Sequence, residues 1–144
     1  MRPDRIVVGE VRGEEAFDMV GSALNCGHDG SMSSGHANSA RDMLVRLENM
    51  ILMAAPLPVS AIRRQIASGV DMIVHLGRLR DKSRKVLEIS EILGMEEEEI
   101  LLNTLFRFRE TSEKKSEKVE GKLEKVGELI HIYKMEAAGL DPLY

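Results

Sequence analysis

Tryptophan is missing from this chain of 144 residues, and aromatic side chains make up only 3% of it. Proteins that hold single-stranded nucleic acid stack bases on aromatic rings, so a binding module of that class is not expected. An excess of positive charge is missing too, because 20 basic residues face 24 acidic ones and the net charge is −4. Bulk electrostatics thus give no reason to expect a nucleic-acid partner.

Paired cysteines and long apolar runs are also missing. Cys26 is the single cysteine, so no internal disulfide can form, and a lone thiol fits a reducing compartment. The longest apolar run, residues 50–55, stops at Pro56 and is far shorter than the roughly 20 residues of a membrane helix. Hydrophobic residues at 43% and charged residues at 31% are typical of a globular domain, so we expect a cytoplasmic protein of domain size.

Residues 1–70 alternate between strand and helix signals. Residues 6–8 form a β-branched run without polar alternation, which predicts a buried, parallel strand. Residues 14–24 carry apolar side chains at helical spacing, after glutamates that suit a helix N-terminus. The glycine- and serine-rich stretch that follows contains a candidate strand of small residues, 31–36.

Two further helices are predicted from their first and last residues. Ser39 and Asp42 form a capping-box pattern, and the helix that they open has an apolar face. Pro58 suits the first turn of the next helix, and Gly69 suits its end. The apolar face of the first of these helices consists of Met43, Leu44, Leu47, Met50 and Ile51.

After residue 69 the pattern changes to that of an antiparallel meander. Residues 70–76 alternate as in a half-buried strand, and the inward set is Val70, Met72, Val74 and Leu76. A turn at 81–83 leads to a second strand, 86–92, and a third is expected at 100–108.

The remaining residues are dense in charge. A solvated loop is expected over 109–125, and 129–133 is a candidate last strand. The whole order is strand-helix-strand-helix-helix followed by a meander, which defines an α/β fold. We divide the chain into residues 1–109 and a charged loop with a C-terminal tail, 110–144.

Glu10 follows the first predicted strand directly, at the position where α/β folds bind their ligands. A carboxylate there can hold Mg²⁺, directly or through water, or orient an attacking water. The alternative is a structural role, in which Glu10 caps the strand or pairs with Arg12. Position alone favours the structural role, and only the surrounding motifs shift the balance toward chemistry.

His28 and His36 flank a run of small polar residues. Small side chains let a backbone approach a ligand closely, and a histidine at a strand end can hydrogen-bond a phosphate. Taken alone, both are more often ordinary loop residues. A zinc site from Cys26, His28 and His36 has only three soft ligands at irregular spacing, and a Cys26–His28 nucleophile pair lacks a group to orient the base. His75 and His131 are interpreted as ordinary strand residues.

Three segments carry a family resemblance. They are RPDRIVVGEVRG (residues 2–13), GHDGSMSSGHANSARDMLVRLENM (27–50) and AIRRQIASGVDMIVHLGRLRDKSRKVLEISEILGME (61–96). In this order they resemble the CpaF (TadA) branch of the type II/type IV secretion ATPases, a family that also contains pilus assembly ATPases. The resemblance implies the C-terminal part of a RecA-like P-loop NTPase domain.

In that family the first segment is the Walker B element and the second is the histidine box. The resemblance implies that Glu10 acts catalytically on Mg²⁺ and the attacking water, and that His36 approaches the γ-phosphate of ATP. His28 belongs to the same box and is expected to bind the nucleotide with His36. The resemblance also implies homo-hexamers at the inner face of the cytoplasmic membrane, working with inner-membrane platform proteins.

A phosphate-binding loop of the pattern G-x-x-x-x-G-K-[ST] is absent from the sequence. The single Gly-Lys pair, Gly121-Lys122, is followed by Leu123. We therefore expect a fragment of an ATPase that powers Tad/Flp-type pilus assembly or type II/IV secretion, missing the P-loop half and inactive alone. The alternative is a non-catalytic interaction module that docks into rings of full-length subunits.

Overall fold

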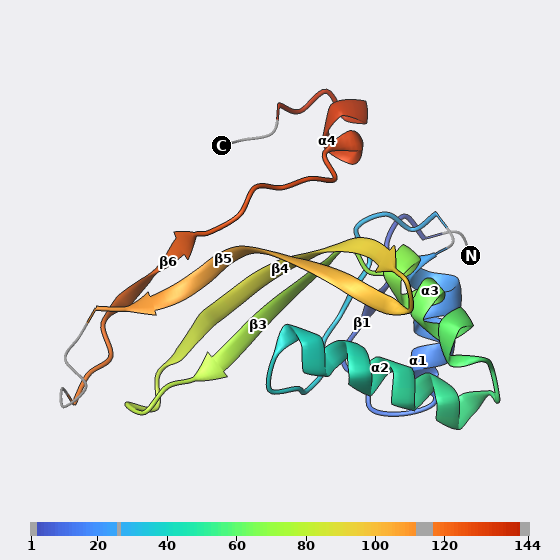
Figure 1. The fold of residues 1–144 in the computed structure, drawn as a ribbon, viewed down its shortest axis with the longest axis horizontal. Coiled ribbons are helices and arrows are strands. Elements are labelled where there is room, and N and C mark those ends of the chain that lie inside the picture. The colour runs from blue at the N-terminus through green and yellow to red at the C-terminus, as the bar shows by residue number, and fades with distance from the viewer. Residues whose placement is uncertain (1–2, 26, 112–116, 142–144) are drawn as a thin grey trace.

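The computed structural model describes residues 3–25, 27–111 and 117–141. The elements form a helical half and a sheet half (Figure 1). Three helices gather around one end of a long antiparallel sheet, and the other end of the sheet extends away from them.

A short parallel pair of strands opens the chain. β1 (Val7–Val8) pairs with β2 (Met32–Ser33), which confirms both predicted strands and the parallel direction. Between them α1 (Glu15–Asp18) continues as a π-helical segment, η1 (Met19–Leu24), so the predicted helix is confirmed. The expected burial is wrong for Val7, which is 70% exposed, because β2 is the one strand that pairs with β1 among the described residues.

Two longer helices follow, α2 (Ala40–Ala54) and α3 (Val59–Gly69). The Ser39 hydroxyl accepts a hydrogen bond of 3.0 Å from the backbone N–H of Asp42, as the capping pattern predicts. Pro58 occupies the N-cap of α3. The predicted apolar face of α2 is buried, and it shares one core with α3 through Leu44, Leu47, Met50, Ile51, Ile62 and Ile66.

The second half is a four-stranded antiparallel sheet in chain order. Its strands are β3 (Met72–Arg78), β4 (Arg84–Glu96), β5 (Glu99–Glu110) and β6 (Gly121–Lys125). The predicted meander is confirmed, with longer strands than expected. The prediction of a solvated loop over 109–125 is wrong for residues 109–110, which end β5, and for residues 121–125, which pair with β5.

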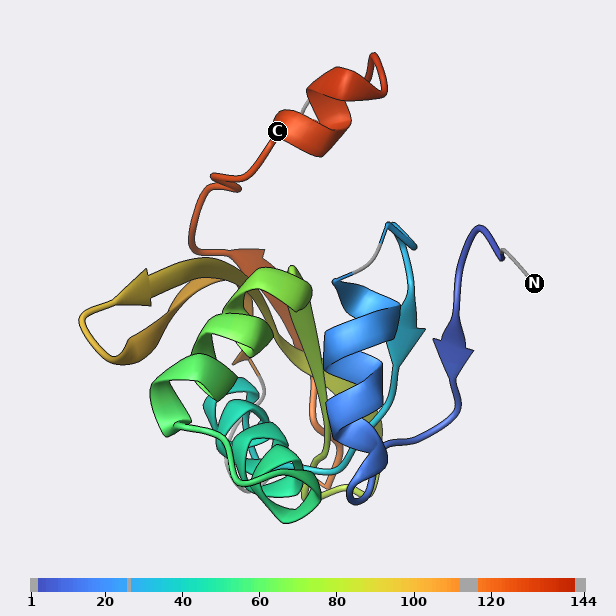
Figure 2. The ribbon, with the colours of Figure 1, turned by 90° about the vertical axis from the view of Figure 1, so that its right-hand side faces the viewer.

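The chain ends in a short helix rather than a strand. The strand expected at 129–133 is wrong, since these residues join no sheet and α4 (Tyr133–Ala137) begins at the last of them. None of the residues of α4 is buried, and the helix lies outside the core at one edge of the fold (Figure 2), where Lys134 contacts Asp29 and Asp71.

Within β3 the two faces are the reverse of the prediction, although Val70, before the strand, packs against the core as expected. Met72, Val74 and Leu76 are 46%, 50% and 64% exposed, whereas Ile73 packs against the core. Alternation predicts that a strand has two different faces, but the helices decide which of them is covered. Here the helices cover the face of Ile73 and of Ile92 on β4.

The core lies where the helices meet one end of the sheet. Residues from α1, η1, α2 and α3 pack together there with Ile92 and Ile100. Within the described ranges, no helix combines the length and the apolar character that crossing a bilayer requires.

Candidate functional site

Glu10 lies two residues after the end of β1, and its side chain is 22% exposed. The chain around it is tied to the segment that follows β2. The Ser34 hydroxyl donates to the carbonyl of Gly9 (2.6 Å), and the backbone N–H of Val11 donates to the carbonyl of Ser34 (2.8 Å). Because β1 and β2 are parallel, the residues after them meet at one edge.

At this edge the structure brings Glu10 and His36 together. His36 Nε2 lies 2.8 Å from Glu10 Oε1, and the Arg12 guanidinium contacts Oε2. Oε1 is buried, and no hydrogen bond of strict geometry reaches it among the described residues. The His36 ring, at ion-pair distance, provides a weaker contact that helps to lower the pKa of Glu10. Oε1 has capacity to accept a water proton or a cation.

The charges beside Glu10 keep it ionised. The hydrogen bond from Arg12 lowers the pKa of Glu10 below its usual value, and the charge of Arg12 and the proximity of His36 act in the same direction. Partial burial opposes this shift and is outweighed. Glu10 is therefore a carboxylate at neutral pH, which is the form that binds a metal or orients a water.

His36 faces solvent, with 83% of its side chain exposed. An open depression of about 560 Å³ lies beside it, against the first turns of α2. The residues that line this depression are His36, Ala37, Asn38, Asp42, Val45 and Arg46. His36 is thus accessible to a ligand while it remains in contact with Glu10.

His28 lies elsewhere. It precedes β2, whereas His36 follows it, so the two histidines stand at opposite ends of the parallel pair. The His28 ring is bonded through Nδ1 to the carbonyl of Pro3 (2.8 Å), and the His28 carbonyl accepts from the Ser31 hydroxyl (2.6 Å). The structure therefore does not bring His28 to the other two residues, although the histidine box predicts one nucleotide site for both.

The alternative metal and nucleophile readings gain no support. No cluster of three or more histidine, cysteine or acidic side chains able to hold a metal occurs in the described residues. Cys26, on which the zinc and nucleophile readings depend, lies outside those residues.

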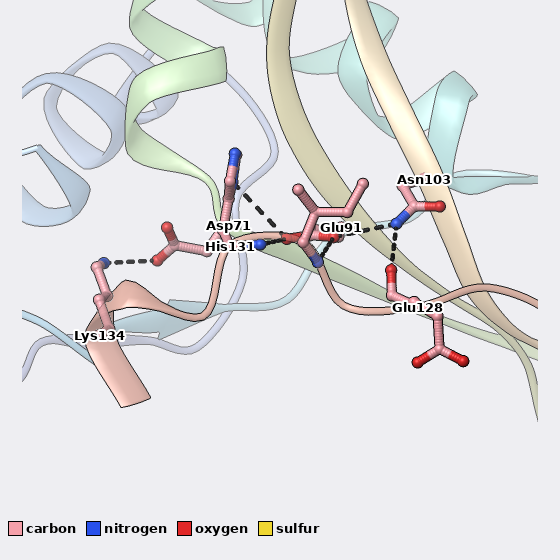
Figure 3. Close-up of polar contacts among 7 residues, drawn as sticks. Asp71, Glu91, Asn103, Glu128, His131 and Lys134 are labelled. Carbon is pink, nitrogen blue, oxygen red and sulfur yellow. Dashed lines mark hydrogen bonds and ion pairs between the residues drawn. The ribbon is translucent and has the colours of Figure 1, made fainter. Parts of the chain in front are cut away.

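Glu91 is a buried acid that the sequence analysis missed. It is 2% exposed on β4 and accepts hydrogen bonds from the backbone N–H groups of Ile130 (3.1 Å) and His131 (2.6 Å) and from Asn103 Nδ2 (3.1 Å). Burial raises its pKa, but these hydrogen bonds outweigh burial and the pKa is lowered overall. His131 is therefore not a strand residue but part of this cluster (Figure 3). The signal was an acid inside an apolar run.

Comparison with protein families identifies the family of the chain. Residues 1–138 match the family described as type II/IV secretion system protein. The chain belongs to this family, which confirms the family level of the resemblance.

The relatives bear the names of conjugal transfer and type IV secretion proteins. A putative conjugal transfer protein of Mycobacterium tuberculosis is 41% identical over 90 residues, which are 62% of this chain and 25% of the relative. The conjugal transfer protein TrbB of Rhizobium radiobacter is 38% identical over 94 residues, 65% of this chain and 28% of that protein. The chain thus spans about a quarter of the length of these relatives.

Similarity to a solved structure extends to the fold as well as the sequence. The VirB11 ATPase of the Brucella suis type IV secretion system, in complex with sulphate, matches with a TM-score of 0.59 and 35% identity. The match covers 63% of this chain and 28% of VirB11. The predicted α/β fold, a part of a RecA-like domain, is confirmed. The roles of Glu10, His28 and His36 and the division at residues 109 and 110 stay predictions.

Proposed function

We propose that this chain is part of a motor that hydrolyses ATP to power Tad/Flp-type pilus assembly or type II/IV secretion, in the CpaF/TadA branch of its family. The observation that carries the proposal is the meeting of Glu10 and His36 at the carboxyl ends of two parallel strands, 2.8 Å apart. Membership of the type II/IV secretion family and likeness to the VirB11 ATPase support it.

Glu10 is proposed to orient the attacking water and to hold Mg²⁺, directly or through water. Proteins bind Mg²⁺ with one or two carboxylates, and phosphate and water oxygens complete the octahedron. One ionised carboxylate, with one oxygen toward Arg12 and the other toward His36, fits this role. Bound Mg²⁺ would supply charge neutralisation for the phosphates.

His36 is proposed to contact the γ-phosphate. An imidazole N–H donates well to a phosphate oxygen, and the exposed ring borders the open depression at α2. Its contact with Glu10 would let it report on the γ-phosphate to the carboxylate that acts on the water. His28 is kept as a nucleotide contact only in the family reading, since its ring is engaged with Pro3 at the other end of β2.

The assembled motor is proposed to be a homo-hexamer at the inner face of the cytoplasmic membrane, working with inner-membrane platform proteins. An alternative is a non-catalytic module that docks into rings of full-length subunits. The exposure of Val7 (70%) and Met32 (59%) on the β1–β2 pair favours contact with further protein in either case.

Measurement of ATP binding and hydrolysis by the purified chain tests whether this segment needs a P-loop from elsewhere in order to act on ATP. The chain lacks the glycine-rich loop and lysine that cradle phosphates, so we expect hydrolysis at the rate of buffer and ATP binding weaker than about millimolar. A full-length motor that contains this segment together with a P-loop should hydrolyse ATP. Calorimetry that shows micromolar ATP binding by the chain alone would overturn the proposal that this segment supplies only part of a nucleotide site.

A further inference from the structure

Residues 126–137, here called the strap, cross the sheet without forming a strand. The strap leaves β6 with the N–H groups of Val126 and Gly127 donating to the carbonyl of Leu105 (2.8 and 3.2 Å). It then passes Glu91, which pairs in register with Met72 and so lies on the sheet face opposite the helices. Only at Tyr133 does regular structure resume, in α4.

Glu91 is the anchor of the strap. Its two oxygens accept the N–H groups of Ile130 and His131, and Asn103 Nδ2 bonds both to Glu91 Oε2 (3.1 Å) and to the carbonyl of Glu128 (2.8 Å) (Figure 3). Charged acceptors give the stronger hydrogen bonds of proteins. The irregular part of the strap, residues 126–132, is therefore held by one buried carboxylate and one amide.

Lys134 connects the strap to two distant parts of the chain. Its Nζ lies 3.0 Å from Asp71 Oδ2, just before β3, and 3.0 Å from Asp29 Oδ1, in the loop of residues 27–31 before β2. Hydrogen bonds to Asp71 and Asp29 raise the pKa of Lys134. One ammonium group thus joins the strap, the sheet and the loop.

The loop in turn holds the parallel pair together. The Ser31 hydroxyl accepts the N–H of Ile6 (2.9 Å), and the N–H of Met32 donates to the carbonyl of Ile6 (3.0 Å). The opposite ends of these strands carry Glu10 and His36. Movement of the loop relative to the sheet would therefore move the pair that presents both residues.

We propose that the strap couples the sheet to the β1–β2 pair, with Glu91 as its anchor and Lys134 as a positioning residue for the loop of residues 27–31. While the strap is docked on Glu91, the ammonium group fixes Asp29 against Asp71. Undocking of the strap releases the loop, so the strap is a conformational device. This inference does not depend on ATP hydrolysis.

Hydrogen exchange on the purified chain tests the positioning role of Lys134. In Lys134→Met the amides of Ser31 and Met32 should exchange about two- to five-fold faster, as expected for loss of ion pairs at the surface. The amides of Ile130 and His131 should be unchanged, because Glu91 still holds them. Lys134→Arg should restore protection at Ser31 and Met32.

Lys125→Met is the matched control, since it removes an ion pair (2.6 Å) to the exposed side chain of Glu128, which is itself a strap residue, without touching the loop. It should leave Ser31 and Met32 unchanged. The proposal is overturned if Lys134→Met does not speed exchange at these two amides, if Lys134→Arg fails to restore them, or if Lys125→Met has the same effect.

Glu91→Gln tests the anchor. The amide group replaces one acceptor oxygen with a donor that faces other donors, so Ile130 and His131 should exchange about tenfold faster or more, and Ser31 and Met32 should follow. The Ile92 amide, which donates to the carbonyl of Asp71 (2.9 Å), reports whether the sheet is intact. Loosening of the strap alone, with an intact sheet, would refute the coupling; if Glu91→Gln unfolds the sheet, the Lys134 variants decide.

Discussion

The two carboxylate oxygens of Glu10 have different surroundings. Oε2 is engaged by Arg12, while Oε1 touches His36 without a hydrogen bond of strict geometry. Arg12 lowers the pKa of the group and keeps it ionised, while Oε1 faces the exposed ring of His36. The ion pair between Glu10 and Arg12, expected as an alternative to a catalytic role, is present in the structure. It does not exclude the proposed catalytic role, because it involves only one of the two oxygens.

His36 should discriminate ATP from ADP in a full-length motor that contains this segment. A donor to the γ-phosphate contributes a charge-assisted hydrogen bond that ADP cannot accept, so His36→Ala should reduce the ATP/ADP affinity ratio by about tenfold. Titration of the motor with both nucleotides measures this ratio. His28→Ala is the comparison, and its ring position beside Pro3 predicts a nearly unchanged ratio. Equal ratios in wild type and His36→Ala would return His36 to the role of a loop residue.

Single residues were predictable where one local rule sufficed. The sequence placed Glu10 after a strand and His36 after the next one, and the structure brings the two together; their roles came from the family resemblance and stay predictions. Glu91 was missed because its backbone donors come from 39 and 40 positions later in the chain. No local pattern reports a partner that arrives from so far along the chain.

At the scale of elements, Asp81 ties the β3–β4 turn to the segment before β6. It accepts from the N–H and hydroxyl of Ser83 (3.0 and 2.6 Å) and from the N–H of Val119 (2.8 Å). These bonds lower the pKa of Asp81 to about 2, with the Ser83 hydroxyl as the main cause. A folded-state pKa below the unfolded value stabilises the fold at higher pH.

The stabilisation from Asp81 should be complete above about pH 4 and should vanish as the pH falls through about 2. Asp81→Asn should therefore be less stable than wild type at pH 7, and the difference should shrink on acidification over that window. Urea unfolding at a series of pH values measures it. A difference that stays constant from pH 7 to pH 2 would show that the charge of Asp81 is not involved.

The β1–β2 pair should be the least protected sheet in the chain. It is a two-stranded sheet with an exposed Val7, whereas β4 has a partner on each side. In a chain shown to be monomeric, the Met32 amide should exchange faster than the Ile92 amide, although both are hydrogen-bonded. Equal protection would mean that this pair has a complete core of its own.

Element types were predictable and their tertiary settings were not. The cap at Ser39 and the apolar face of α2 are local features, and both were predicted correctly. The covered face of β3 depends on where the helices pack, and the alternation cannot report that. β6 was missed because its charged residues resemble a solvated loop, although pairing with β5 at the sheet edge places them in a strand.

At the scale of the whole molecule, the fold class followed from the order of elements and the family followed from three segments. The family match over residues 1–138 reaches beyond the meander and includes the strap. The relatives are about four times as long as the part matched here. The activity of the assembled protein is therefore tested in a longer chain that contains this segment.

Glu10→Gln in such a full-length motor tests the central claim that Glu10 is the catalytic carboxylate. Glutamine keeps the shape and removes the charge, so nucleotide binding should be nearly intact. Turnover should fall by about 10²–10⁴-fold, which corresponds to about 3–5 kcal/mol of barrier. Glu14→Gln, at an exposed position just before α1, should keep wild-type turnover. Wild-type ATP turnover in the Glu10→Gln motor would contradict the account.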